Sequence, residues 1–288
     1  MPSLKEIKGC IASVQSTLKI TSAMKLVASA KLRKAQQAIE AMRPYEASLQ
    51  QMYRNLLASV TEGADAREAV SAGEGPERVA IVAIASNSSL CGSFNANAVA
   101  RVKDLLAEHP LATVYSVGRK MADAMRKAGR PSPKDFSALA EHPSYGAAAD
   151  LAEDLAEDFE KGKYTRIYLV YNHFVSTAKQ VPTVETFLPR TVPAPVAVPS
   201  APVTDYIVEP AAGKLLEALY PKTLKLKLYT ALLDSAAAEH AARTVAMQTA
   251  TDNAENLLTE LTLQYNKGRQ QKITSEILDL AGGQAENQ

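Results

Sequence analysis

Both ends of the chain carry a narrow stripe of apolar residues that recurs every three or four positions. The N-terminal stripe is Ile7, Ile11, Val14 and Leu18, followed after a polar interval by Ile39, Met42, Leu49 and Leu56. The C-terminal stripe is Leu228, Leu232, Ala238, Ala242, Val245, Ala254, Leu257 or Leu258, Leu261 and Tyr265. About two apolar positions in seven suit one partner helix better than a broad core. We therefore expect the two ends to pair as an antiparallel coiled coil, the alternative being two separate amphipathic helices on a globular core.

Local signals set the expected limits of these helices. Ser3 followed by Glu6 is the pattern of a capping box at a helix start. Pro44 should kink the first helix without ending it, because apolar periodicity resumes beyond it. Pro221 is expected to be the last interruption before the C-terminal helix.

The middle of the chain alternates strand and helix patterns, which predicts a small Rossmann-like α/β domain. The expected strands are 79–85, 112–117, 166–171 and 181–188, the last at a sheet edge because of Pro182. The expected helices are 95–106, 118–127 and 147–161. The predicted organisation is an N-terminal coiled-coil helix over 1–60, an α/β domain over 76–206 and a C-terminal coiled-coil helix over 207–288.

Composition narrows the possible functions. The 32 basic residues nearly balance the 31 acidic ones, which argues against a dedicated nucleic-acid binder. No apolar run reaches the length of about 20 residues that spans a membrane, and no signal-peptide core is visible. The two cysteines and four histidines show no metal-ligand spacing, so we expect no metal and no cofactor.

Two polar segments are candidates for partner contacts. Residues 7–39 contain six basic residues and no acidic one, which favours an acidic partner surface. The segment Asn266–Lys272 is polar on every face of its expected helix. We expect this C-terminal helix to outreach the N-terminal one, so that its polar segment meets another protein and not the chain's own first helix.

The residues 20–36 (ITSAMKLVASAKLRKAQ) and 250–277 closely resemble the two signature segments of the gamma subunit of bacterial F-type ATP synthases. LCGSFNANA, residues 90–98, resembles that family's middle motif. The resemblance spans the whole chain and is most specific at its two ends.

The resemblance implies a non-catalytic rotor shaft that couples proton-driven rotation of the membrane c-ring to ATP synthesis, and the reverse. Its partners would be three alpha and three beta subunits, the epsilon subunit and the c-ring, with no nucleic acid. Its place would be the cytoplasmic face of the bacterial inner membrane, as a peripheral protein. Carried over by position, the contacts to beta and alpha subunits would be Met24, Lys25, Arg243, Arg269, Gln270 and Thr274.

Two departures from the family pattern concern these contacts. Asn87, Ser88 and Ser89 stand where the family usually has Asp-Arg-Gly, which removes an expected arginine contact. Gly268 replaces the usual alanine before Arg269 and Gln270, which softens the helix there.

Two other classes of function compete with the shaft. An enzyme would have to use the loop SNSSLCGSFN, with Cys91 as nucleophile or the backbone as a phosphate cradle, although it lacks GxxxxGK[ST], GxGxxG and GxSxG. A coiled-coil scaffold or nucleic-acid-binding arm would explain the long helices but not the polar segment near the C-terminus.

Overall fold

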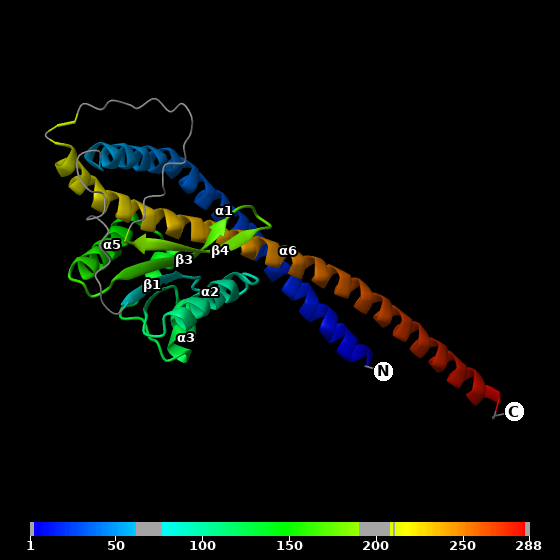
Figure 1. Ribbon diagram of the computed structural model, residues 1–288. Helices are drawn as coiled ribbons and strands as arrows, with labels where there is room; N and C mark the ends of the chain where they lie inside the picture. The colour runs from blue at the N-terminus through cyan, green and yellow to red at the C-terminus, as the bar shows by residue number, and fades with distance from the viewer. Residues whose placement is uncertain (1–2, 62–76, 190–207, 210, 286–288) are drawn as a thin grey trace. The chain divides into compact units, whose positions relative to one another are not determined.

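The computed structural model describes residues 3–61, 77–189, 208–209 and 211–285, with residues 57–61 and 279–285 described by their backbone only. The elements are α1 (Leu4–Thr61), β1 (Val79–Ile84), α2 (Phe94–Glu108), β2 (Thr113–Val117), α3 (Arg119–Lys127), α4 (Ser137–Glu141), α5 (Tyr145–Glu160), β3 (Arg166–Phe174), β4 (Gln180–Leu188) and α6 (Ala212–Ala285) (Figure 1).

The chain divides into two compact units. Residues 1–28 and 243–288 make up the first, here called the helical unit, and residues 29–242 the second, the sheet unit. Both α1 and α6 continue from one unit into the other. The boundaries between these units lie at residues 28 and 242, whereas the expected boundaries lie at residues 60, 76 and 207. The division into three parts therefore stays a prediction.

The ends of the two long helices follow the local signals only in part. The Ser3 N–H donates to Glu6 Oε2 at 2.8 Å and the Glu6 N–H donates to Ser3 Oγ at 3.2 Å, which confirms the capping box. Pro44 lies inside α1, as expected. The expectation for Pro221 was wrong, because α6 begins at Ala212 and passes through it. Pro221 is exposed, so water can satisfy the carbonyl that its missing N–H leaves free.

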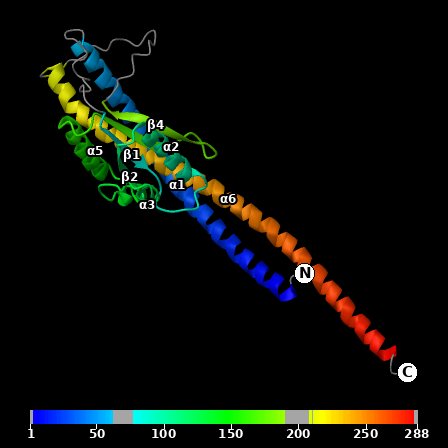
Figure 2. The ribbon, with the colours of Figure 1, turned by 60° about the horizontal axis from the view of Figure 1, so that its bottom comes forward.

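In the helical unit α1 and α6 form the expected antiparallel pair. On α1 between residues 3 and 21, the only side chains that are not exposed are Leu4, Ile7, Ile11, Val14, Leu18 and Thr21. On α6 between residues 251 and 270 they are Thr251, Ala254, Leu258, Leu261, Tyr265 and Gly268. Both sets step by three and four in alternation, which is a strict heptad repeat. Figure 2 shows the red end of α6 running beyond the first residue of α1.

The burial pattern corrects two details of the predicted stripes. Val245 is 42% exposed, and Met247 is the buried residue in its place. Leu258, not Leu257, lies in the helix pair. The interval after Leu18 that read as polar also holds the buried residues Thr21 and Ala28, so the stripe on α1 is not interrupted there.

The sheet unit contains a four-stranded sheet in the order β2-β1-β3-β4. β1 is parallel to both of its neighbours, and β4 is antiparallel to β3 at the edge, where Pro182 was expected. The short helix α4 was not predicted from the sequence. The fold class, a long antiparallel helix pair with a small α/β domain, is confirmed.

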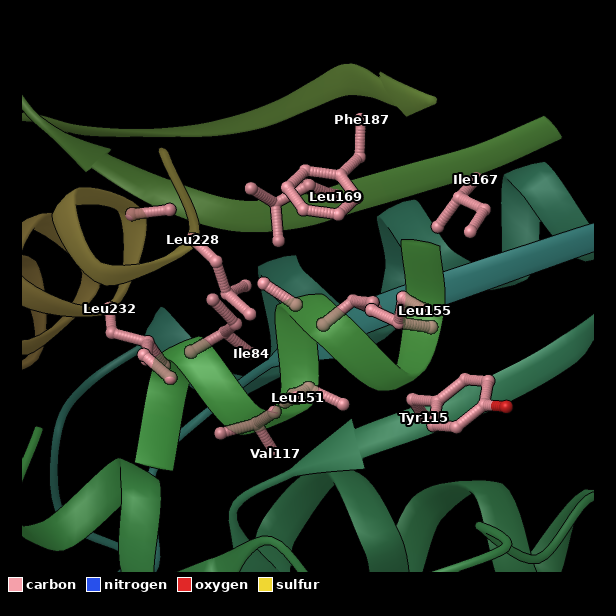
Figure 3. Packing of buried hydrophobic residues seen from close by; sticks show 14 of the residues in the cluster. Ile84, Tyr115, Val117, Leu151, Leu155, Ile167, Leu169, Phe187, Leu228 and Leu232 are labelled. Carbon is pink, nitrogen blue, oxygen red and sulfur yellow. The ribbon is translucent and has the colours of Figure 1, made fainter. Parts of the chain in front are cut away.

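Two apolar cores cover the two faces of the sheet. Alternate residues of β1 divide between them: Val79, Ile81 and Ala83 face α2 and α3, and Ala80, Val82 and Ile84 face α5 and α6. Figure 3 shows Leu228 and Leu232 of α6 packed among Leu151 and Leu155 of α5 and the strand residues Leu169 and Phe187. The long helix is therefore part of the core of the α/β domain.

Candidate coupling surfaces

All six expected contact residues lie in the helical unit, on α1 and α6. Met24 and Lys25 are half-buried on α1. Arg243 is buried, with 9% of its surface exposed. Arg269, Gln270 and Thr274 are exposed on α6, and the Thr274 hydroxyl donates to the Gln270 carbonyl at 2.9 Å. The structure thus presents the last three to a partner and leaves Arg243 little access to one.

The segment that holds Met24 and Lys25 also exposes large apolar side chains. Ile20, Leu26 and Val27 are 60%, 68% and 57% exposed. Sequence reasoning did not single them out, although their positions outside the apolar stripe were visible in the motif ITSAMKLV. Apolar and basic side chains together on one helix suit a protein surface better than nucleic acid.

The polar segment of α6 lies differently from the expectation. A groove of about 770 Å³ lies between the start of α1 and this part of α6; it is lined by Ser3, by Leu4, Lys5 and Ile7 of α1, and by Gln264, Lys267, Gly268, Gln271 and Lys272 of α6. The prediction that this segment would lie clear of the chain's own first helix was therefore wrong for one of its faces. Arg269 and Gln270 lie on the exposed remainder of the segment.

In the sheet unit, the loop after β1 is held by its own polar groups. Asn95 Oδ1 accepts the Ser86 N–H at 3.0 Å, and Asn95 Nδ2 donates to Cys91 Sγ at 3.1 Å. Asn87 donates to the Ser137 carbonyl and accepts the Arg119 N–H, both at 2.9 Å. Asn87 thus ties the loop to the first turns of α3 and α4.

Burial argues against the enzyme alternative at this loop. Cys91 is 1% exposed, so its thiol is out of reach of a substrate. Within the described residues, no group of three His, Cys, Asp or Glu side chains is placed to hold a metal ion.

The usual ligand crevice of an α/β fold is also filled. The order β2-β1-β3 puts the topological switch point at the carboxyl end of β1, where such folds bind ligands. Cys91, Phe94 and Phe174 pack there against Ala238 and Ala242 of α6. Buried Asn172 of β3 donates to the Phe94 carbonyl at 3.1 Å. A helix of this chain therefore fills the crevice in which such folds bind their ligands.

Polar contacts fasten α6 to the sheet beside that crevice. Asp234 Oδ1 accepts the Phe174 N–H at 3.1 Å, and Asp234 Oδ2 pairs with His173 Nδ1 at 2.5 Å. Lys227 pairs with Glu185, which also accepts the Tyr171 hydroxyl at 2.8 Å. Burial raises the pKa of Tyr171 well above its usual range, and the neighbouring Glu185 carboxylate adds to the rise. The hydroxyl therefore stays protonated and keeps its donor role.

No helix in the described ranges carries an apolar stretch long enough to cross a bilayer.

The face of α5 that carries Glu153, Asp154 and Glu157 is exposed and makes ion pairs with Lys225, Lys134 and Lys161. These carboxylates therefore form a solvated helix face.

Comparison with known proteins identifies the family. A family model described as ATP synthase matches residues 3–285. The ATP synthase gamma chain of Phocaeicola vulgatus is 49% identical over 289 residues, covering 98% of this chain and 99% of the relative. That of Flavobacterium johnsoniae is 43% identical over 287 residues, with 98% of each chain covered.

Solved structures agree in fold. A chain of the central stalk and c-ring structure of the Tetrahymena thermophila mitochondrial ATP synthase is 25% identical, with a TM-score of 0.59 over 80% of this chain and 99% of that one. A chain of the Euglena gracilis mitochondrial ATP synthase is similar in fold, with a TM-score of 0.54 at 21% identity over 92% of this chain and 94% of that one. The chain therefore belongs to the ATP synthase gamma chain family.

Proposed function

We infer that this chain is the central shaft of an F-type ATP synthase, a subunit without catalytic sites of its own that couples rotation of a c-ring to ATP synthesis, and the reverse. The observation that carries this function is the double role of α6. The same uninterrupted helix belongs to the core of the α/β domain through Leu228 and Leu232 and pairs with α1 in the helical unit.

This arrangement suits the transfer of torque. The α/β domain would rest on the epsilon subunit and the c-ring, and proton flow would turn it. The Asp234 contacts and the Lys227–Glu185 pair then resist rotation of α6 against the sheet. The helical unit would stand inside a ring of three alpha and three beta subunits.

The residues proposed to meet that ring are those carried over from the family. Met24 and Lys25 would contact a beta subunit next to the exposed apolar side chains Leu26 and Val27. Arg269, Gln270 and Thr274 would form polar contacts that exist only at some rotor angles. Arg243, which is buried, would act chiefly by supporting the surface around it.

The proposed place of the chain is the cytoplasmic face of a bacterial inner membrane, held there by the c-ring and not by a membrane span of its own. Isolation of the tagged chain from its native membranes tests both place and partners. Alpha, beta and epsilon subunits should elute with it in a complex that hydrolyses ATP. Recovery of nucleic acid, released by salt, without these subunits would refute the proposal in favour of a nucleic-acid-binding arm.

A further inference from the structure

The heptad layers of the helical unit share one register. Thr251 Oγ1 donates to Thr21 Oγ1 at 3.0 Å, and Gly268 lies against Leu4. In both pairs the two residue numbers add up to 272. The same register places Ile7 opposite Tyr265, Ile11 opposite Leu261, Val14 opposite Leu258 and Leu18 opposite Ala254. The Leu4–Gly268 layer is therefore the last of six consecutive layers.

This last layer is built around the missing side chain of Gly268. A β-carbon built on Gly268 would lie 3.0 Å from Cδ2 of Leu4 and 3.9 Å from its Cγ. A contact of 3.0 Å is tighter than most packed β-carbons make, so an alanine here would require the Leu4 side chain to give way by a few tenths of an ångström. Leu4 also belongs to the first turn of α1, in which the Ser3–Glu6 capping box satisfies the N–H group of Glu6.

We propose that Gly268 is a positioning residue: it forms the seat for Leu4 and so closes the end of the helix pair. The glycine at this position allows the Leu4 side chain to approach the backbone of α6 closely, in addition to lowering the local stability of that helix. By closing the pair, the seat fixes the orientation of the neighbouring Arg269 and Gln270 relative to α1. This second part of the proposal rests on the proposed function, in which those two residues contact a partner.

The first test compares two Gly→Ala substitutions within helices of the same unit in the full-length chain. Gly9 on α1 has no atom within 4 Å of a built β-carbon, so it is a matched control. Alanine is the better helix former, and Gly9→Ala should slow amide hydrogen exchange of the surrounding turns by up to about fivefold. Gly268→Ala should give no such slowing around residues 4–12 and 262–272, and Gly268→Leu should speed exchange there by about tenfold.

Removal of the Leu4 side chain should change how Gly268→Ala affects hydrogen exchange. In a Leu4→Ala background, Gly268→Ala should slow exchange as Gly9→Ala does, because the obstructing side chain is gone. If Gly268→Ala slows exchange in the natural chain as much as Gly9→Ala, Leu4 does not occupy the seat and the proposal is wrong.

The assembled complex tests the orientation of Arg269 and Gln270. Gly268→Leu should lower ATP turnover several-fold, and adding Leu4→Ala should restore most of it. If Gly268→Leu speeds hydrogen exchange but leaves turnover unchanged, only the claim that Gly268 orients Arg269 and Gln270 is overturned. Failure of the natural chain to assemble with alpha and beta subunits would instead refute the proposed function.

Discussion

The carboxylate of Asp234 on α6 accepts the backbone N–H of Phe174, at the last residue of β3, at 3.1 Å. The two residues are 60 positions apart in the sequence, so this contact joins the long helix to the sheet and not to its own neighbours. The other oxygen of Asp234 pairs with His173. One side chain therefore fixes α6 to two consecutive positions of the strand.

Asp234→Ala should lower the free energy of unfolding by about 1–3 kcal/mol, because the Phe174 N–H loses its acceptor in a half-buried place. Urea unfolding of the full-length chain measures the change. Asp252→Ala removes an exposed carboxylate from the same helix, one that accepts from Gln248 of the preceding helical turn at 2.6 Å, and should cost much less. Equal losses for the two variants would count against the contact to the sheet.

Gly118→Ala should be among the most damaging single substitutions in the sheet unit. Gly118 follows β2 with a φ of 95°, and a β-carbon there would lie 2.2 Å from the Ala85 carbonyl oxygen. Both the backbone conformation and the space require glycine. We expect a loss of about 3 kcal/mol or more, seen as poor folding or a much lower melting temperature.

Gly146→Ala is the control for that experiment. Gly146 lies in α5 with nothing within 4 Å of a built β-carbon, so its replacement should leave stability unchanged or raise it slightly. A stable Gly118→Ala chain would show that the connections after β1 and β2 do not approach as closely as described.

The two cysteines should differ sharply in their reaction with a thiol reagent. Cys10 is exposed on α1, whereas Cys91 is buried in the loop after β1. In the native chain one equivalent of iodoacetamide should react quickly at Cys10, and Cys91 should react only after unfolding. Mass spectrometry of labelled peptides distinguishes the two sites. Rapid labelling of Cys91 would reopen the enzyme reading of its loop.

The double variant Arg269→Ala, Gln270→Ala should lower ATP turnover of the assembled complex while leaving assembly intact. Both side chains are exposed on α6, so their loss leaves the fold unchanged, and charge-assisted hydrogen bonds contribute about 1.5–3 kcal/mol each. Arg101→Ala on α2 removes an arginine whose partner is Asp104, at 3.6 Å, and should have no effect on turnover. Normal hydrolysis and synthesis rates in the double variant would remove the two residues from the coupling mechanism.

Patterns of short period were readable from the sequence, and long-range contacts were not. The heptad stripe on α1 and the apolar run of β1 follow from the spacing of residues along one element, so both were predicted. Val245 was wrongly assigned to the buried stripe of α6, because the sequence does not show at which residue the buried face of a long helix shifts. Met247 is also apolar, and it is the residue that is buried. The helix α4 is too short for a periodic signal.

At the candidate surfaces, too, the sequence identified features that depend on local motifs and missed those that depend on long-range contacts. The family motifs identified Arg269 and Gln270, and these are exposed. The prediction that the polar segment of α6 would lie clear of α1 was partly wrong, because helix lengths alone do not reveal that Leu4 reaches Gly268. Asp234 carried no local signal, since its partner is formed only when the sheet folds.

The place of Leu224, Leu228 and Leu232 in the core of the sheet unit has a consequence for biosynthesis. All four strands and α5 precede residue 189, yet the core between α5 and the sheet lacks its α6 side chains until the chain has been synthesised past residue 232. The ribosome hides the last few tens of residues, so a nascent chain carrying the complete sheet sequence still lacks part of its core. We expect the sheet to fold late, after most of α6 has emerged, and to depend on chaperones until then.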